Sequence, residues 1–323
     1  MANYKELEGF GVQTLTTDPD STGWVGSIFY NSTSGTFKTV KPGGIPAGTW
    51  SSGGNLNTTR CELGGTGTLT AGLAYGGRTP PSAVTGATEK YNGTSWTSVN
   101  SLGTARREFG SAGIQTSAIC MGPNAVETYD GTNWTSVTSI NSNREQGMGL
   151  GLVNTDAILA GGSLPGATGA TEIWNGSTWT ELNDLNTARL FAGSAGSTTA
   201  GLVFAGTPPG TIVVTESWDG TSWTEVSDLN TGGWALGGSG TQTDALAFGG
   251  GNFPTLYANT EYWNGTSWTE VADLATARDT LGSAGLSATA SLAFGGRTAP
   301  TTFLNATEEW LAPDVVINTL TTS

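Results

Sequence analysis

A short phrase recurs along this chain and ends each time in tryptophan. It contains an Arg, a run of small residues, an apolar stretch that usually ends in Gly-Gly, and then Glu-x-(Tyr/Trp)-(Asn/Asp)-Gly-x-x-Trp. The step between repeats is about 38 to 46 residues, and the final tryptophans are Trp50, Trp96, Trp134, Trp179, Trp223 and Trp268. A repeat of this length with regular Gly and Trp is typical of a β-propeller, in which one repeat forms one four-stranded blade.

The fifth repeat shows how a blade is predicted to form. Residues 234–240 are mostly small and fit an innermost strand, and residues 244–250 form an apolar run suited to a strand buried on both faces. Residues 260–263 form the third strand, and residues 268–271 alternate apolar and polar side chains as a half-exposed edge strand does. The Asn264-Gly265 dipeptide between them favours the positive φ angles of a type I′ hairpin turn.

The sixth repeat lacks its fourth strand. It contains Arg278 and Thr307-Glu-Glu-Trp310, but no Asn-Gly-x-x-Trp hairpin follows. A segment that matches the missing strand lies near the other end of the sequence, around Trp50. We therefore predict an all-β fold, a six-bladed β-propeller over residues 46–312. The last blade is closed by an N-terminal strand from residues 48–54, which removes two open sheet edges.

Two kinds of repeated side chain are predicted to hold the blades together. The tryptophan that ends each repeat is expected to pack between neighbouring blades. Each repeat also carries a Glu that shares a strand face with an aromatic residue two positions later, at Glu89, Glu127, Glu172, Glu216, Glu261 and Glu308. A buried carboxylate needs a partner, and five repeats offer one, at Arg60, Arg106, Arg144, Arg189 and Arg278. Metal binding or catalysis by these acids is the alternative.

The fifth repeat breaks this pattern. Gly233 stands where the other repeats have their arginine. Glu261 is therefore expected to be paired elsewhere or hydrated.

Composition excludes several classes of function. The chain has no histidine, which removes His-based acid–base catalysis, Ser-His-Asp triads and imidazole metal sites. It has 26 acidic and 12 basic residues, a net charge of −14, which argues against binding nucleic acid or anionic lipid. We predict that the protein is not an enzyme and has no catalytic residues, no metal and no cofactor. A glycosidase needs only two carboxylates, so this enzyme class stays open as an alternative.

The sequence shows neither a membrane-spanning apolar run nor an N-terminal signal-peptide pattern. No apolar run approaches the roughly 20 residues that a membrane helix needs, and the N-terminus, Met1-Ala-Asn-Tyr-Lys-Glu, does not resemble a signal peptide. We predict no signal peptide, no transmembrane segment and no membrane insertion. The two cysteines, Cys61 and Cys120, lie in different repeats and are expected to be buried, unpaired thiols.

The connections between the second and third strands vary most from repeat to repeat. In a propeller these connections share one face with the connections that lead into the innermost strands. Loops on a rigid scaffold often carry binding residues, and aromatic side chains there can stack on sugar rings. The candidate binding residues are Arg78, Phe253, Tyr257, Arg297 and Phe303. Ordinary loop packing is the alternative role for all five.

The two ends of the chain differ from the repeats. Residues 1–45 hold three of the four lysines and read as a small β-hairpin module, followed by a Pro/Gly linker. Residues 313–323 read as a C-terminal tail. The module is too short for a core of its own, so it should dock on the propeller or on another protein. The candidate attachment residues are Trp24, Phe29, Tyr30 and Phe37.

Two resemblances follow from these residues. The order of Gly-Gly, aromatic residue and Trp over about residues 46–312 resembles the Kelch repeat. The segment Tyr30-Asn-Ser-Thr-Ser-Gly-Thr-Phe37-Lys38 resembles the N-terminal module of virion structural proteins of marine bacteriophages, especially those that infect cyanobacteria. This second resemblance implies a virion component, assembled in the host cytoplasm, whose partners are other virion proteins. It also leaves open an alternative, a module that binds a glycan or receptor on the host surface.

Overall fold

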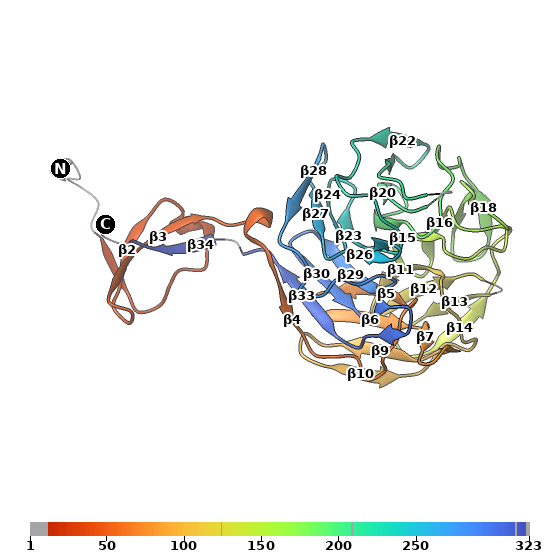
Figure 1. The fold of residues 1–323 in the computed structure, drawn as a ribbon, viewed down its shortest axis with the longest axis horizontal. Coiled ribbons are helices and arrows are strands. Elements are labelled where there is room, and N and C mark those ends of the chain that lie inside the picture. Colours follow the sequence, from red (N-terminus) through yellow and green to blue (C-terminus); the bar gives the residue numbers. More distant parts are fainter. Residues whose placement is uncertain (1–11, 124, 208–209, 314, 321–323) are drawn as a thin grey trace. The chain divides into compact units, whose positions relative to one another are not determined.

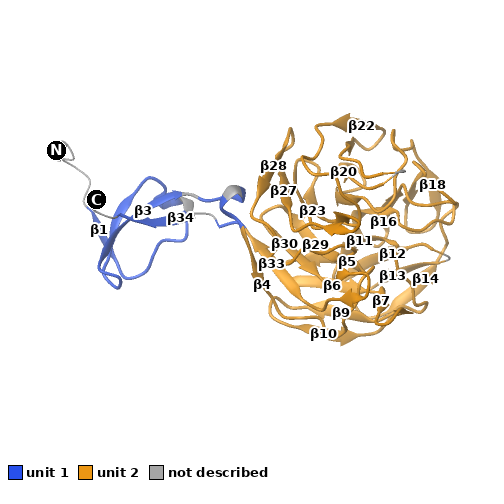
Figure 2. Cartoon of the chain, in the orientation of Figure 1, with its two compact units in different colours: residues 1–48, 312–323 blue, residues 49–311 orange. Residues whose placement is uncertain are grey.

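The computed structural model describes residues 12–123, 125–207, 210–313 and 315–320, and it divides the chain into two compact units (Figure 2). Unit 1 comprises residues 1–48 and 312–323, and unit 2 comprises residues 49–311. The chain is all-β, and unit 2 has a β-propeller-like fold built from four-stranded antiparallel sheets (Figure 1). The described helical turns are η2 (Thr22–Trp24) and η3 (Ile45–Ala47). Within the described residues, no helix is long and apolar enough to span a bilayer.

Sheets 1 to 3 follow one another along the chain, each running from an innermost strand to an outer one. Sheet 1 contains β5 (Gly64–Thr68), β6 (Ala71–Tyr75), β9 (Thr88–Tyr91) and β10 (Trp96–Val99). Sheet 2 contains β11 (Gly110–Ile114), β12 (Ser117–Met121), β13 (Val126–Tyr129) and β14 (Trp134–Val137). Sheet 3 contains β15 (Met148–Val153), β16 (Asp156–Ala160), β17 (Thr171–Trp174) and β18 (Trp179–Glu181).

Sheets 4 and 5 repeat the pattern, and sheet 6 takes a strand from a distant part of the chain. Sheet 4 contains β19 (Gly193–Gly196), β20 (Gly201–Phe204), β21 (Thr215–Trp218) and β22 (Trp223–Val226). Sheet 5 contains β23 (Gly237–Thr241), β24 (Asp244–Phe248), β27 (Thr260–Trp263) and β28 (Trp268–Val271). Sheet 6 contains β29 (Gly282–Ser287), β30 (Ala290–Phe294), β33 (Thr307–Leu311) and β4 (Thr49–Ser52), with Trp310 opposite Trp50.

Three short two-stranded ribbons lie in the connections between second and third strands. They pair β7 (Arg78–Thr79) with β8 (Ala83–Val84), β25 (Gly251–Asn252) with β26 (Thr255–Leu256), and β31 (Arg297–Ala299) with β32 (Thr302–Phe303).

Two details of the fifth repeat differ from the prediction. Its innermost strand begins at Gly237 rather than at Trp234, because Ala235 has a φ of 56° and turns the chain before the strand starts. The turn at Asn264-Gly265 is not type I′, since Gly265 has a positive φ and Asn264 does not. The Asn264 side chain instead accepts hydrogen bonds from the N–H groups of Thr266 and Ser267, both at 2.9 Å, which stabilises a longer turn.

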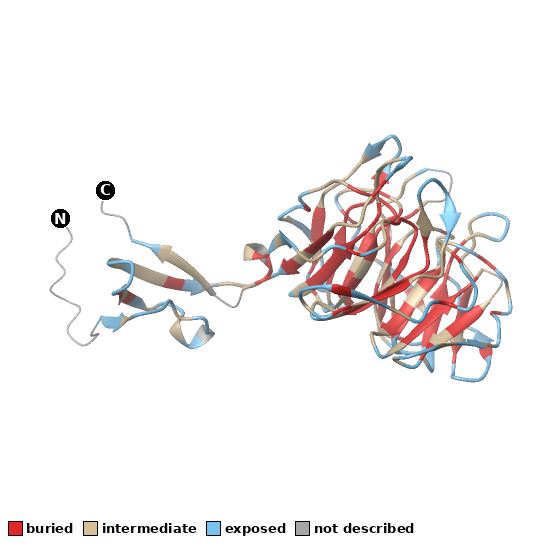
Figure 3. Cartoon of the chain, turned by 90° about the horizontal axis from the view of Figure 1, so that it is seen from below, coloured by how far each residue is buried: buried red, intermediate tan, exposed pale blue. Residues whose placement is uncertain are grey.

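The repeated tryptophans pack between neighbouring sheets, as predicted. Trp96 donates its indole N–H to Thr307 Oγ1 at 2.9 Å, Trp134 to Thr88 at 3.1 Å, and Trp268 to Thr215 at 3.1 Å, and each acceptor begins the third strand of the preceding sheet. Trp50 of sheet 6 makes the same bond to Thr260 of sheet 5, at 2.9 Å. The other two indoles, Trp179 and Trp223, lie in apolar clusters that join sheets 2 and 3 and sheets 3 and 4. The interior of unit 2 is therefore a series of apolar layers between sheets (Figure 3).

The predicted Glu–Arg pairs are confirmed in five sheets. Their side chains are buried, and the pairs are Arg60–Glu89, Arg106–Glu127, Arg144–Glu172, Arg189–Glu216 and Arg278–Glu308. Burial lowers the pKa of Arg60 to about 10. Removing one partner of such a pair would leave an uncompensated charge in the interior, so each sheet depends on both.

The two thiols are buried and free, as predicted. Burial, and to a smaller extent the charge of Glu62, raises the pKa of Cys61 to about 11. Burial also raises the pKa of Cys120. Both groups therefore remain protonated, poorly reactive thiols at neutral pH.

Unit 1 is a four-stranded sheet rather than a hairpin with a separate tail. Its strand order is β1 (Gln13–Leu15), β2 (Ile28–Asn31), β3 (Thr36–Pro42) and β34 (Val315–Thr319). The predicted hairpin corresponds to β2 and β3. The prediction of a separate tail is wrong, because β34, from the other end of the chain, pairs antiparallel with β3 and satisfies an edge that the hairpin alone would leave open. Phe29, Val40 and Ile45 are buried and give this unit a small core, so the expectation that the segment is too short for a core of its own is wrong.

Candidate functional site

One face of unit 2 combines two sets of connections, those that lead into innermost strands and those that follow second strands. Isolated β-bridges join the two sets within five sheets, at Cys61–Arg78, Glu145–Ser163, Leu190–Thr207, Trp234–Gly251 and Asp279–Arg297. The prediction that these connections share a face is confirmed. We call this surface the loop face.

Six residues form a closed ring of backbone hydrogen bonds at the centre of the loop face. They are not glycines, yet each has a φ between 52° and 61°: Glu62, Glu108, Gln146, Phe191, Ala235 and Thr280. Each N–H donates to the carbonyl of the preceding ring member, and the N–H of Glu62 closes the ring on Thr280 O at 2.8 Å. Left-handed backbone at such residues costs free energy, and the ring bonds offset part of it. The same residues line a cavity of about 120 Å³.

One side of this ring is charged. Glu62 accepts hydrogen bonds from Arg78 at 2.6 Å and from Arg107 at 2.5 Å. Asp279 accepts two hydrogen bonds from Arg297, at 2.7 and 3.1 Å, and these raise the pKa of that guanidinium above its usual value. Two of the predicted binding residues, Arg78 and Arg297, are thus held in ion pairs in this structure.

Phe303 belongs to the same charged region. The Arg78 guanidinium lies 5.2 Å from the centre of the Phe303 ring, which joins the connections of sheets 1 and 6. Only 8% of Phe303 is exposed, because it pairs with Arg297 across β31 and β32 and lies beneath Arg78. Its ring is therefore mostly covered and offers little surface for stacking on a ligand.

The other side of the ring is aromatic. Phe253 is 59% exposed and Tyr257 is partly exposed, both in the connection of sheet 5. Phe191 and Trp234, also partly exposed, pack against each other with ring centres 5.6 Å apart. This second pair was not among the predicted binding residues. The sequence carries a sign of this pair in the turn before the innermost strand. Phe191 stands where the other repeats have Glu, Gln, Ala or Thr, and Trp234 lies one position earlier in its own repeat.

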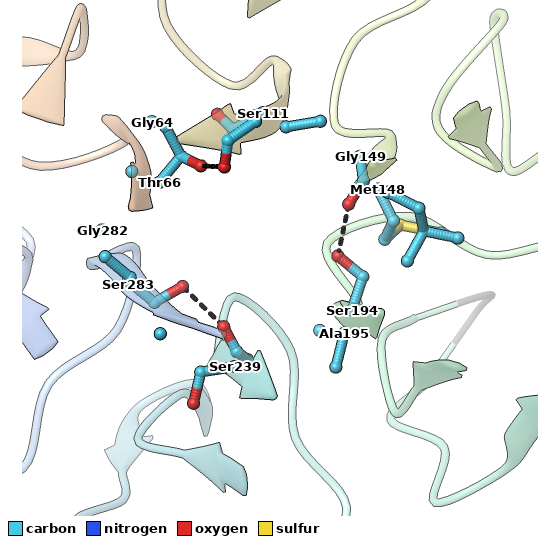
Figure 4. Close-up of a pocket in the computed structure, with 18 of the residues that line it drawn as sticks. Gly64, Thr66, Ser111, Met148, Gly149, Ser194, Ala195, Ser239, Gly282 and Ser283 are labelled. Carbon is cyan, nitrogen blue, oxygen red and sulfur yellow. Dashed lines mark hydrogen bonds between the residues drawn. The ribbon is translucent and has the colours of Figure 1, made fainter. Parts of the chain in front are cut away.

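A channel of about 180 Å³ runs between the innermost strands, and its lining combines Gly, Ser, Ala and Thr with larger apolar residues such as Met148 (Figure 4). Glycine and serine alternate from one sheet to the next at the same strand position: Gly65, Ser111, Gly149, Ser194, Gly238 and Ser283. A Cβ atom on Gly149 would lie 2.2 Å from Ser111 O, so a side chain cannot fit there. Ser194 donates to Gly149 O at 3.0 Å, and Ser283 donates to Gly238 O at 2.9 Å.

This channel carries hydroxyl and backbone groups but no ionisable side chain among the residues that line it. Elsewhere in the described part of the chain, no three Cys, Asp or Glu side chains gather in a way that could hold a metal ion. The channel can hydrogen-bond water or a neutral polar group. Its lining offers no side chain for acid–base chemistry.

The predicted attachment residues divide between the two faces of the unit 1 sheet. Tyr30 and Phe37 are cross-strand partners whose ring centres lie 5.2 Å apart, and Phe37 is 49% exposed. Trp24 is partly exposed. Phe29 is fully buried, because adjacent residues of a strand point to opposite faces, and it therefore packs in the core of unit 1 instead of facing a partner.

Comparison with known proteins gives a likeness in structure but not in sequence. No family model matches the chain, and no curated protein sequence is similar to it. The structure is similar to that of a protein called YjhT, with a TM-score of 0.66 and 13% sequence identity, over 82% of this chain and 99% of YjhT. At this identity, the likeness shows a shared fold and no more.

Proposed function

We propose that this protein is a non-enzymatic structural component of a bacteriophage virion, an appendage or fibre-associated protein. Unit 1 attaches it to other virion proteins, and unit 2 presents the loop face for interaction. The observation that carries the proposal is the exposed apolar face of unit 1. This small unit is a single sheet that contains strands from both ends of the described chain. The resemblance of residues 30–38 to the N-terminal module of phage structural proteins supports it.

We also propose that unit 2 is a closed, six-bladed, Kelch-like propeller with β4 as the outer strand of the last blade. Three observations support this. The ring of hydrogen bonds on the loop face returns to its starting residue. The innermost strands contact one another in the cyclic order β5, β11, β15, β19, β23, β29 and again β5. Apolar residues of sheet 1, among them Trp96, cluster with Leu292 and Phe294 of sheet 6, as sheets adjacent in sequence do.

The attachment surface is the face of the unit 1 sheet opposite Phe29. Ile28 is 48% exposed, Phe37 is 49% exposed, and Leu320 is 46% exposed. Tyr30 lies between them on the same face, since the register pairs Tyr30 with Phe37 and the N–H of Leu320 bonds to Phe37 O. Exposed apolar side chains that gather on one face of a small sheet are suited to burial against another protein.

Replacing Ile28 and Phe37 together by serine is expected to prevent incorporation into virions. Each side chain contributes about 1.5 kcal/mol or more when it is buried, so binding should weaken roughly 100-fold. Purified particles probed for the protein measure this. Leu152→Ser, at a site in unit 2 with 45% exposure, is the matched control and should leave incorporation unchanged. Normal incorporation of the double variant would contradict the attachment role.

A second candidate function, binding of a glycan or receptor on the host surface, is favoured by the aromatic side of the loop face. Aromatic rings that are exposed on a rigid scaffold can cover the apolar face of a sugar. Phe253→Ala with Tyr257→Ala is expected to reduce binding of unit 2 to its glycan on an array at least tenfold. Leu164→Ala, an exposed position in the equivalent connection of sheet 3, is the control. Unchanged binding by the aromatic variant would exclude this part of the face.

A further inference from the structure

Five sheets hold the same guanidinium site. In each, the arginine that precedes the innermost strand binds the carboxylate of the third strand and also donates to backbone carbonyls. In sheet 4, Arg189 donates to Glu216 at 2.5 Å, to the carbonyl of Thr187 at 3.1 Å and to those of Ala205 and Val214 at 3.2 and 2.6 Å. In sheet 6, Arg278 makes the corresponding contacts with Thr276, Gly295, Ala306 and Glu308.

Sheet 5 keeps these acceptors but has no arginine. The residues at the corresponding positions are Thr231, Gly249, Asn259 and Glu261, and all four line one small cavity of about 10 Å³ together with Gly233. Gly233 occupies the arginine position, and its carbonyl accepts from Gly206 N–H as the carbonyl of Arg189 accepts from Gly162 N–H. The backbone of the site is therefore intact, and only the cationic side chain is missing.

Glu261 is buried without a cation. It is 3% exposed, and among the described residues no Lys or Arg forms an ion pair with it. Its oxygens accept from Asn230 N–H, Asn230 Nδ2 and Thr231 N–H, each at 2.8 Å. These donors satisfy hydrogen bonds but do not neutralise the charge, so a cation with N–H donors would stabilise the site.

We propose that sheet 5 binds a guanidinium group from outside the chain, an arginine side chain of a partner or a free guanidinium compound. The chain itself shows, in its five other sheets, that this set of oxygens recognises guanidinium. Planar N–H donors match a carboxylate flanked by carbonyls better than a spherical ion does. Guanidinium binding at this site does not depend on the proposed virion role.

Tyr257 controls access to this site. It lines the cavity, is partly exposed on the loop face, and its Cδ2 atom lies 3.5 Å from the position of a Cβ on Gly233. The ring thus covers the space that the arginine stem fills in other sheets, and the cavity beneath it has room for about one water molecule. A guanidinium group enters by displacing this ring, so Tyr257→Ala should lower the concentration needed for binding.

The test is thermal unfolding of the full chain in low millimolar guanidinium chloride, far below denaturing concentrations. Wild type is expected to gain roughly 2–4 °C in melting temperature over the same concentration of potassium chloride, once guanidinium exceeds its Kd several-fold. Gly233→Arg should have a similarly raised melting temperature without ligand and should show no further rise with guanidinium. Its Cβ meets only ordinary contacts at 3.5 Å, and its stem displaces the Tyr257 ring as the free group does. In Glu261→Gln, guanidinium should likewise no longer raise the melting temperature.

Matched variants make the result decisive. Arg278→Gly should melt at a lower temperature than wild type, because it leaves Glu308 without its cation. Its melting temperature should rise more in guanidinium than that of wild type, since it has a second such site in sheet 6, whereas Gly233→Ala should behave as wild type. An arginine-containing peptide that acts at lower concentration than guanidinium would identify a protein partner as the source, and equal potency would identify a free compound. The proposal is overturned if guanidinium raises the melting temperature of wild type no more than potassium does. It is also overturned if guanidinium still raises the melting temperature of Gly233→Arg.

Discussion

A chain of residues 53–311 is expected to lose cooperative folding, whereas a chain of residues 49–311 should fold. The four residues that separate them form β4, which pairs with β33 along the outer side of sheet 6. Trp50 in this strand packs on Trp310 at 5.6 Å and on Phe248 of sheet 5 at 4.9 Å between ring centres, and its indole donates to Thr260 at 2.9 Å. Without β4, the apolar layer between sheets 5 and 6 is opened to water.

Loss of one large indole from a buried layer costs about 3–5 kcal/mol, and the unpaired edge of β33 adds to that, so the total approaches the stability of a typical domain. Circular dichroism during heating, with both chains at equal concentration, measures the difference. The chain of residues 49–311 also lacks unit 1, so it separates the effect of β4 from that of the attached sheet. Equal melting temperatures for the two chains would show that β4 is dispensable for unit 2.

The sequence predicts best what the repeats share. Glu216 and Arg189 occur at fixed positions in their repeat, and the need of a buried carboxylate for a cation is enough to predict that they pair. The segment around Trp50 could be matched to the missing strand of the sixth repeat because neighbouring repeats show what that strand looks like. Repetition supplies an internal comparison, so a single sequence carries unusual information about this part of the chain.

Features that occur once are predicted poorly. Val316 and Ile317 in β34 gave no sign that they pair with β3, since nothing local links two segments at opposite ends of a chain. Arg78 and Phe303 looked like independent loop residues, but their contact depends on how sheets 1 and 6 meet. The vacant arginine site was visible as Gly233 in the sequence, whereas the cavity beside Glu261 depends on the packing of Tyr257, which no sequence pattern indicates.

Trp223→Ala is expected to destabilise unit 2 by about 3–5 kcal/mol. The indole is 5% exposed and lies in an apolar cluster with Leu150 and Ile158 of sheet 3, where surrounding strands leave little freedom to collapse into the space. No acceptor among the described residues lies within hydrogen-bonding distance of its N–H, so the loss comes from packing alone. Trp268→Ala, which also removes the bond to Thr215, should cost about 1 kcal/mol more. Urea denaturation of both variants measures the free energies, and a loss near zero for Trp223→Ala would mean that this indole is available to a ligand instead.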